Sequence, residues 1–206
     1  MTLHAPPTSS ALDEETARAE LYGVLALLYY AAPSPDLLAQ LRAAATEAPA
    51  AGALLEEPWR VLVGLARSLP DGAIAQEFDA LFGGIGKPEV YLYGSHFLSG
   101  FLNEKPLARL RTDLAALGLA RDDAMSETED HVACLCEVMR YLIAGDDVAV
   151  ANLTRQREFF TRHLLPWTLQ MCEAVAAHPK ARFYKSLAGF TQAFTSVESQ
   201  GFDMLS

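Results

Sequence analysis

Apolar residues recur at intervals of three and four along most of the chain, which is the spacing of one face of an α-helix. The first such run extends from Leu21 to Tyr29, and Pro33 and Pro35 end it because proline cannot continue a helix. The same spacing, with proline and aspartate at several boundaries, predicts further helices over residues 36–47, 58–69, 71–82, 104–117, 127–144, 147–164, 167–177 and 181–196.

Strand signals are sparse. Residues 90–93, Val-Tyr-Leu-Tyr, form the only stretch with strand character, and alternation of period two never extends over six residues. The sequence therefore predicts an all-α fold, a single bundle of about nine or ten helices. Residues 1–12, rich in Pro, Thr, Ser and Ala, are expected to form a flexible tail before one domain over 13–206. The polar connector 118–126 is a candidate hinge, so we expect either a monomer or a dimer that exchanges helices.

Charge narrows the range of partners. Of 206 residues, 16 are Lys or Arg and 26 are Asp or Glu, which gives a net charge of −10. This charge repels a phosphate backbone, so we expect no nucleic-acid partner and favour a cationic one. The longest apolar stretch, 21–33, is shorter than the ~20 residues of a membrane span. The three cysteines show no disulfide spacing and the N-terminus lacks a basic signal region, so the sequence predicts a cytoplasmic protein without membrane insertion.

The sharpest local signal is the acidic segment 126–131, Ser-Glu-Thr-Glu-Asp-His, which precedes an apolar run. Ser126 and Glu129 have the spacing of a capping box, and this structural role would explain most of the segment. A functional interpretation adds His131, because Glu127 and Asp130 beside it would raise its pKa and orient the ring. The acidic side chains here would also bind a pair of arginines.

Other chemistries are poorly supported. The histidines and cysteines do not have the spacing of a zinc or di-iron site, so we expect no metal and interpret the cysteines as buried packing residues. The glycine-rich stretch 83–88 lacks the Ser or Thr that follows a P-loop lysine, and no nucleophile elbow is present. The aromatic segment that contains Tyr91, Ser95, His96 and Phe97 could line a peptide groove or fill space between helices.

Four segments in order resemble the TorD/DmsD/NarJ family of redox-enzyme maturation chaperones. Residues 127–131, Glu-Thr-Glu-Asp-His, are similar to its E-P-x-D-H motif, with Thr128 at the usual proline. The other similar segments are 21–25 (Leu-Tyr-Gly-Val-Leu), 78–83 (Phe-Asp-Ala-Leu-Phe-Gly) and 159–167, which ends His-Leu-Leu-Pro-Trp. The similarity spans about 21–194.

The resemblance implies an all-helical cytoplasmic chaperone, not an enzyme. It implies that the chaperone binds the twin-arginine leader or the apo form of a molybdopterin oxidoreductase, assists cofactor insertion and delays export. It implies no cofactor of its own, with weak nucleotide binding left open. Carried over by position, Asp130 and His131 would belong to the peptide-binding site. The resemblance also places Phe78, Leu81 and Phe82 on an adjoining apolar wall. To these residues we add Glu127, Tyr91 and Ser95.

Two other function classes stay open at the level of sequence. One is a small enzyme or nucleotide-binding protein that uses His131 and Asp130 as an acid/base pair. The other is a structural helical adaptor within a larger complex. For the chaperone, we expect Asp130→Ala and His131→Ala to weaken client binding and to leave thermal stability nearly unchanged.

Overall fold

The structure is a computed structural model that describes residues 9–46, 54–83, 87–122 and 124–204. Its helices are α1 (Ser9–Tyr30), α2 (Pro35–Ala43), α3 (Glu56–Ser68), α4 (Asp71–Leu81), α5 (Gly94–Ser99), α6 (Lys105–Ala116), α7 (Val132–Ala144), α8 (Leu153–Phe159), a π-helical turn (Phe160–Leu164), α9 (Leu165–Ala177) and α10 (Phe183–Asp203). Within the described ranges the one β-type pairing is an isolated antiparallel bridge between Tyr93 and His131. The predicted all-α fold is confirmed.

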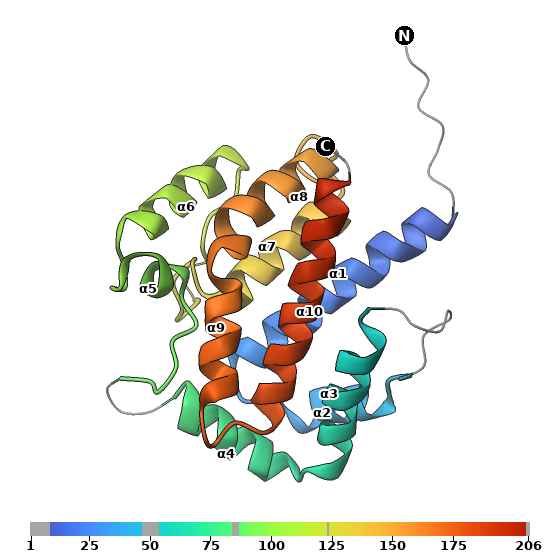
Figure 1. Ribbon diagram of the computed structural model, residues 1–206. Coiled ribbons are helices and arrows are strands. Elements are labelled where there is room, and N and C mark those ends of the chain that lie inside the picture. The colour runs from blue at the N-terminus through green and yellow to red at the C-terminus, as the bar shows by residue number, and fades with distance from the viewer. Residues whose placement is uncertain (1–8, 47–53, 84–86, 123, 205–206) are drawn as a thin grey trace.

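The helices pack around one core. The long helix α1 lies against α7, and α10 lies against α9 on one side and α3 on the other (Figure 1). The shorter helices α5 and α6 stack beside one another at the edge of the bundle, and α4 runs across the end near the start of α10. The largest fully buried side chains are aromatic and come from α1, α9, α10 and the π-helical turn; they are Trp167, Tyr29, Tyr184, Phe160, Phe183 and Phe190.

Local capping explains several boundaries. The hydroxyl of Ser34 accepts a hydrogen bond from the Leu37 N–H, and Pro35 occupies the first helical position of α2, where its missing N–H costs nothing. Gly118 ends α6 in the left-handed region at φ 73°, which a side chain disfavours. The N–H groups of Gly118 and Leu119 then bond back to Ala115 and Leu114, which is a Schellman motif.

Several predicted boundaries differ from the structure. Helix α1 begins at Ser9, inside the predicted tail, whose residues 1–8 lie outside the described ranges. Helix α8 begins at Leu153 and not at 147, because the side chain of Asn152 caps it by accepting from the Arg155 N–H. Asp71 is the first residue of α4 and not its cap, and its carboxylate pairs with Arg42 of α2 at 2.6 Å. The short α5 was not predicted.

The structure tests the prediction that the three cysteines are buried packing residues. Cys134, Cys136 and Cys172 are all buried and unbridged, which confirms that they are packing residues. Burial raises the pKa of each of the three thiols.

Among the described residues, no group of three His, Cys, Asp or Glu side chains is placed to hold a metal ion. No helix in the same ranges is both long and apolar enough to cross a membrane.

Candidate functional site

The acidic segment does not form the predicted capping box. Helix α7 begins at Val132, and His131 is its N-cap, with Nδ1 accepting a hydrogen bond from the Ala133 N–H at 3.2 Å. Ser126 and Glu129 therefore lie in the loop before the helix. Backbone pairing to the segment that precedes α5 fixes this arrangement, since the Val132 N–H donates to the Leu92 carbonyl at 2.8 Å. The prediction placed the N-cap at Ser126 because the local spacing favoured that residue. In the structure, the contact between Val132 and the distant Leu92 sets the start of the helix.

Asp130 is 3% exposed and is held by two hydrogen bonds. One carboxylate oxygen accepts from the Ser95 N–H at 2.8 Å, and the other accepts from the Thr128 hydroxyl at 2.7 Å. Its own carbonyl accepts from the Gly94 N–H at 2.9 Å. Asp130 therefore joins the start of α5 to the start of α7. Thr128, which stands where the family motif has proline, is part of this junction.

The other two acids of the segment also have partners inside the chain. Glu127 is half-buried and accepts a short hydrogen bond from the Tyr93 hydroxyl. Glu129 accepts two hydrogen bonds from Arg111 of α6, each 2.9 Å long. Burial and the bond to Glu127 raise the pKa of Tyr93, so the phenol stays protonated and remains the donor. The charges of this segment thus serve mainly to join α5, α6 and α7.

The pKa of His131 is shifted in the direction opposite to the sequence prediction. It is 4% exposed, and its ring contacts that of Tyr93 edge to face with 5.0 Å between the centroids. Burial lowers its pKa from 6.5 to about 4, and the nearby carboxylates of Glu127 and Asp130 offset only part of that effect. The expected raised pKa is therefore wrong: the ring is neutral at pH 7, as its role as a hydrogen-bond acceptor requires.

This neutral cap makes stability sensitive to acid. In the unfolded chain His131 titrates near pH 6.5 and in the fold near 4, so between these values the unfolded chain binds more protons. The titration of His131 therefore leaves the free energy of unfolding nearly unchanged above pH 6.5. As the pH drops below that value, it lowers this free energy, by about 3 kcal/mol at pH 4. We expect His131→Asn, which keeps a capping acceptor without titrating, to lose less unfolding free energy than the wild type between pH 7 and 5. Urea unfolding at both pH values measures this difference, and equal losses would contradict the assignment.

The predicted apolar wall lies at the end of α4. Leu81 is fully buried, and its carbonyl accepts from the Val90 N–H at 2.9 Å. Phe78 and Phe82 are half-buried, and their rings pack on Tyr184 of α10 with centroids 5.8 and 5.0 Å apart. These two phenylalanines therefore support the core more than they present a free surface. The glycine-rich stretch after them lies partly outside the described residues, at 84–86.

Tyr91 and Ser95 flank the acidic segment. The half-buried ring of Tyr91 stacks on His96 at 4.1 Å between centroids. Ser95 is completely buried, and its hydroxyl is a buried polar group with no hydrogen-bond partner among the described residues. Behind it, Gly94 lies so close to Trp167 that a Cβ would stand 3.0 Å from the indole nitrogen. The structure thus brings Ser95 together with Asp130, while Tyr91 lies nearer the surface beside α5.

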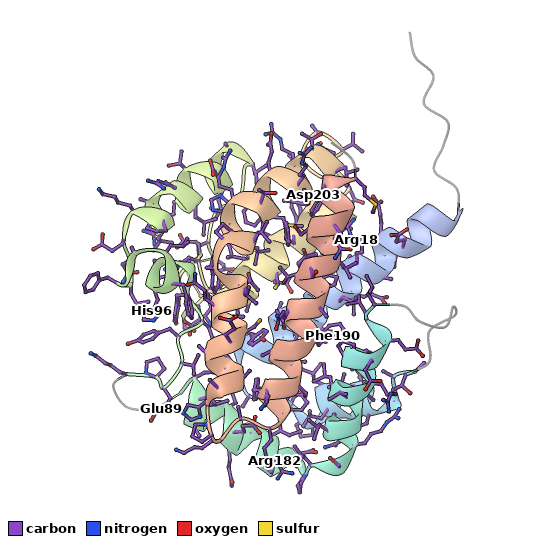
Figure 2. The ribbon with its side chains drawn as sticks, in the orientation of Figure 1. Arg18, Glu89, His96, Arg182, Phe190 and Asp203 are labelled. Atoms are coloured by element: carbon purple, nitrogen blue, oxygen red, sulfur yellow. The ribbon has the colours of Figure 1, made fainter. Side chains whose placement is uncertain are left out.

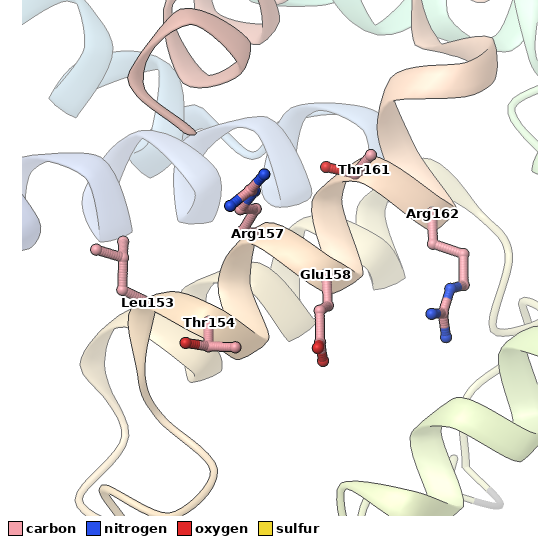
Figure 3. A pocket seen from close by; sticks show the side chains of 6 residues that line it. All are labelled: Leu153, Thr154, Arg157, Glu158, Thr161 and Arg162. Carbon is pink, nitrogen blue, oxygen red and sulfur yellow. The ribbon is translucent and has the colours of Figure 1, made fainter. Parts of the chain in front are cut away.

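Three surface hollows of the described residues contain none of the predicted site residues in their lining. A hollow of about 630 Å³ on α8 is lined by polar and charged side chains, including Arg157, Glu158 and Arg162 (Figure 3). The connector furrow, about 420 Å³ in volume, lies between α7 and residues 119–121 and 125, with Glu129 among its lining residues. The helical groove, about 510 Å³ in volume, is mainly apolar and is formed by α1, α2 and α3 over Phe190 of α10.

Sequence reasoning missed two carboxylate interactions that organise this region. Glu77 of α4 is buried and accepts hydrogen bonds from the N–H groups at the start of α10. Glu129 was noticed, but its partner Arg111 was not, since 18 residues separate them. In the sequence, Glu77 directly precedes Phe78 within a predicted helix, which was a weak signal for the interaction of Glu77. No local pattern could have revealed the second.

Comparison with known proteins gives consistent matches. The sequence model described as nitrate reductase delta subunit matches residues 38–173. A chaperone protein TorD from Vibrio cholerae serotype O1 (strain ATCC 39541) is 26% identical over 204 residues, which cover 91% of this chain and 93% of the relative. A chaperone protein TorD from Vibrio parahaemolyticus is 25% identical over 134 residues, covering 61% and 62% respectively.

One solved structure shares the fold. The crystal structure of a putative redox enzyme maturation protein from Archaeoglobus fulgidus superposes with a TM-score of 0.51 and covers 95% of this chain and 97% of its own. At 20% sequence identity, this likeness supports the arrangement of the helices alone.

Proposed function

Since the chain belongs to the nitrate reductase delta subunit family, we propose that it is a maturation chaperone that binds the twin-arginine leader or the apo form of a molybdopterin oxidoreductase. The match to a chaperone protein TorD over 91% of the chain is the observation that carries this proposal. The resemblance noted in the sequence is thereby confirmed, and so is the prediction that the protein is a chaperone and not an enzyme. Cytoplasmic location and assistance in cofactor insertion are parts of the proposal.

The chemistry of such a leader suits this chain. A twin-arginine leader is basic at its start and apolar in its middle, and the chain has a net charge of −10 and apolar surface hollows. An exposed ion pair contributes only ~0.2–1 kcal/mol, whereas burying a leucine or phenylalanine contributes ~1.5–3 kcal/mol. The apolar contacts should therefore set most of the affinity, and the carboxylates should set orientation and association rate.

The predicted peptide-binding residues fall into two groups, one buried and one half-buried. Asp130, His131, Leu81 and Ser95 are buried, so their contribution to binding would come through the positions of their neighbours. The half-buried members remain candidates for direct contact with the client; they are Glu127, Phe78, Phe82 and Tyr91.

The enzyme alternative has little support from this geometry. An acid/base pair must reach a substrate, yet Asp130 and His131 are 3% and 4% exposed. The Nδ1 atom of His131 is also engaged in capping α7. The adaptor alternative makes a different prediction, which is a stable partner at fixed stoichiometry rather than a transient client.

Titration calorimetry tests the proposed function. We expect the 206-residue chain to bind a synthetic twin-arginine leader of a molybdopterin oxidoreductase, and to bind a version with both arginines changed to glutamine more weakly. Raising the salt concentration should weaken binding only modestly, because screening affects the ion pairs and not the apolar contacts. If neither any such leader nor the apo-enzyme binds at low salt, the proposed function is wrong.

A further inference from the structure

We propose that the helical groove between α1, α2 and α3 is the receptor for the apolar stretch of the client's leader, a conclusion that rests on the proposed function and assigns its site. The groove follows one face of α1, on which Ala17, Leu21, Val24 and Leu28 recur at helical spacing. Leu37 and Leu41 of α2 form part of the second wall. Nothing in the sequence prediction placed a binding site here.

The groove has the size of a short helix. Its face on α1 extends from residue 17 to residue 28, which corresponds to about 16 Å of helix, or three turns. A peptide helix of that length presents one apolar face to a groove, with side chains at every third and fourth position inserted between its walls. The apolar middle of a leader has the composition that such a face requires.

Trp59 of α3 gives the groove a fixed aromatic wall. Its indole N–H donates to the Ala45 carbonyl at 2.8 Å, and its ring packs on Phe190 with centroids 5.2 Å apart. Figure 2 labels Phe190 on the side of α10 that faces α3. The ring of Trp59 is therefore held in place while it is only half-buried. Rigid, partly exposed aromatic side chains are the usual anchors of binding surfaces.

Charge separates this groove from the other two hollows. In the part of the chain that the structure describes, its charged lining residues are Glu20 and Glu56, both acidic. The α8 hollow contains Arg157 and Arg162, which would repel the arginines of a leader. The connector furrow is lined by Glu129 and Glu137 but also by Arg121 and Arg140, so its charged lining is mixed. Of these three hollows, the helical groove is the one that combines a mainly apolar lining with charged residues that are all acidic.

A charge placed at the rim tests the site without disturbing the core. Ala17 is exposed on α1 and lines the groove, and Ala108 is an equally exposed helical alanine on α6, away from it. We expect Ala17→Arg to weaken binding of the synthetic twin-arginine leader at least tenfold in titration calorimetry with the 206-residue chain. Ala108→Arg carries the same added charge, and it should bind the leader as the wild type does.

Tryptophan emission provides an independent local signal. The chain has two tryptophans, and Trp167 is 1% exposed, so a tryptophan-free leader should change mainly the emission of Trp59. We expect a blue shift on binding that Trp59→Phe abolishes. If the leader binds the wild type, Ala17→Arg and Ala108→Arg equally well, the groove is not the site although the proposed function stands. If it binds none of them, the proposed function fails as well.

Discussion

Replacing Glu77 with alanine is expected to lower the free energy of unfolding by about 4 kcal/mol. The carboxylate accepts hydrogen bonds from the N–H groups of Arg182, Phe183 and Tyr184 at 2.8, 3.1 and 2.8 Å. These are the free donors of the first turn of α10, and no side chain of α10 caps them. Glu77 is 8% exposed, so little water is available to replace it. A loss of this size is a large part of the total stability of an ordinary domain.

Urea unfolding at pH 7 measures this effect. The exposed Glu173 of α9 provides the matched control, because Glu173→Ala removes the same side chain without uncovering a helix start. We expect that control to change the unfolding free energy by less than about 0.5 kcal/mol. Glu77→Gln should fall between the two, since an amide oxygen still accepts. A loss below about 1 kcal/mol for Glu77→Ala would show that α10 does not depend on this cap.

Asp130→Ala is expected to lower the free energy of unfolding by about 3 kcal/mol, contrary to the sequence expectation of nearly unchanged stability. The substitution leaves the Ser95 N–H and the Thr128 hydroxyl without their acceptor in a region with almost no solvent access. It also releases the start of α5 from the start of α7. Any weaker leader binding by this variant would therefore include an effect of the altered fold.

Three further variants separate the effect on the fold from the effect on client binding. Asp130→Asn keeps one oxygen acceptor and should recover part of the lost stability, whereas Asp146→Ala, at an exposed position, should change it little. Glu127→Gln changes a half-buried carboxylate and tests direct contact with a client at smaller cost to the fold. Thermal unfolding together with leader titration measures both properties. If Asp130→Ala melts like the wild type, the junction at Ser95 does not support the fold.

The agreement between sequence and structure is best where short-range rules apply. The apolar spacing from Leu21 to Tyr29 and the prolines after it located the end of α1 correctly, at Tyr30. The prediction failed at the start of α7, where Ser126 and Glu129 satisfied a local rule and His131 took the position instead. Hydrogen bonds from the segment before α5 decided between them, and those residues lie more than 30 positions away.

The sequence by itself determined the all-α class, most helix spans and the acidic character of the chain, because helix periodicity, proline and net charge are properties of neighbouring residues or of composition. The tertiary structure alone decided which carboxylates are available. It placed Asp130 against the Ser95 N–H and the Thr128 hydroxyl, Glu129 against Arg111 and Glu77 at the start of α10. It also formed the helical groove, since three helices and Phe190 must pack together before that surface exists. Burial and pairing depend on contacts between distant segments, which no local pattern encodes.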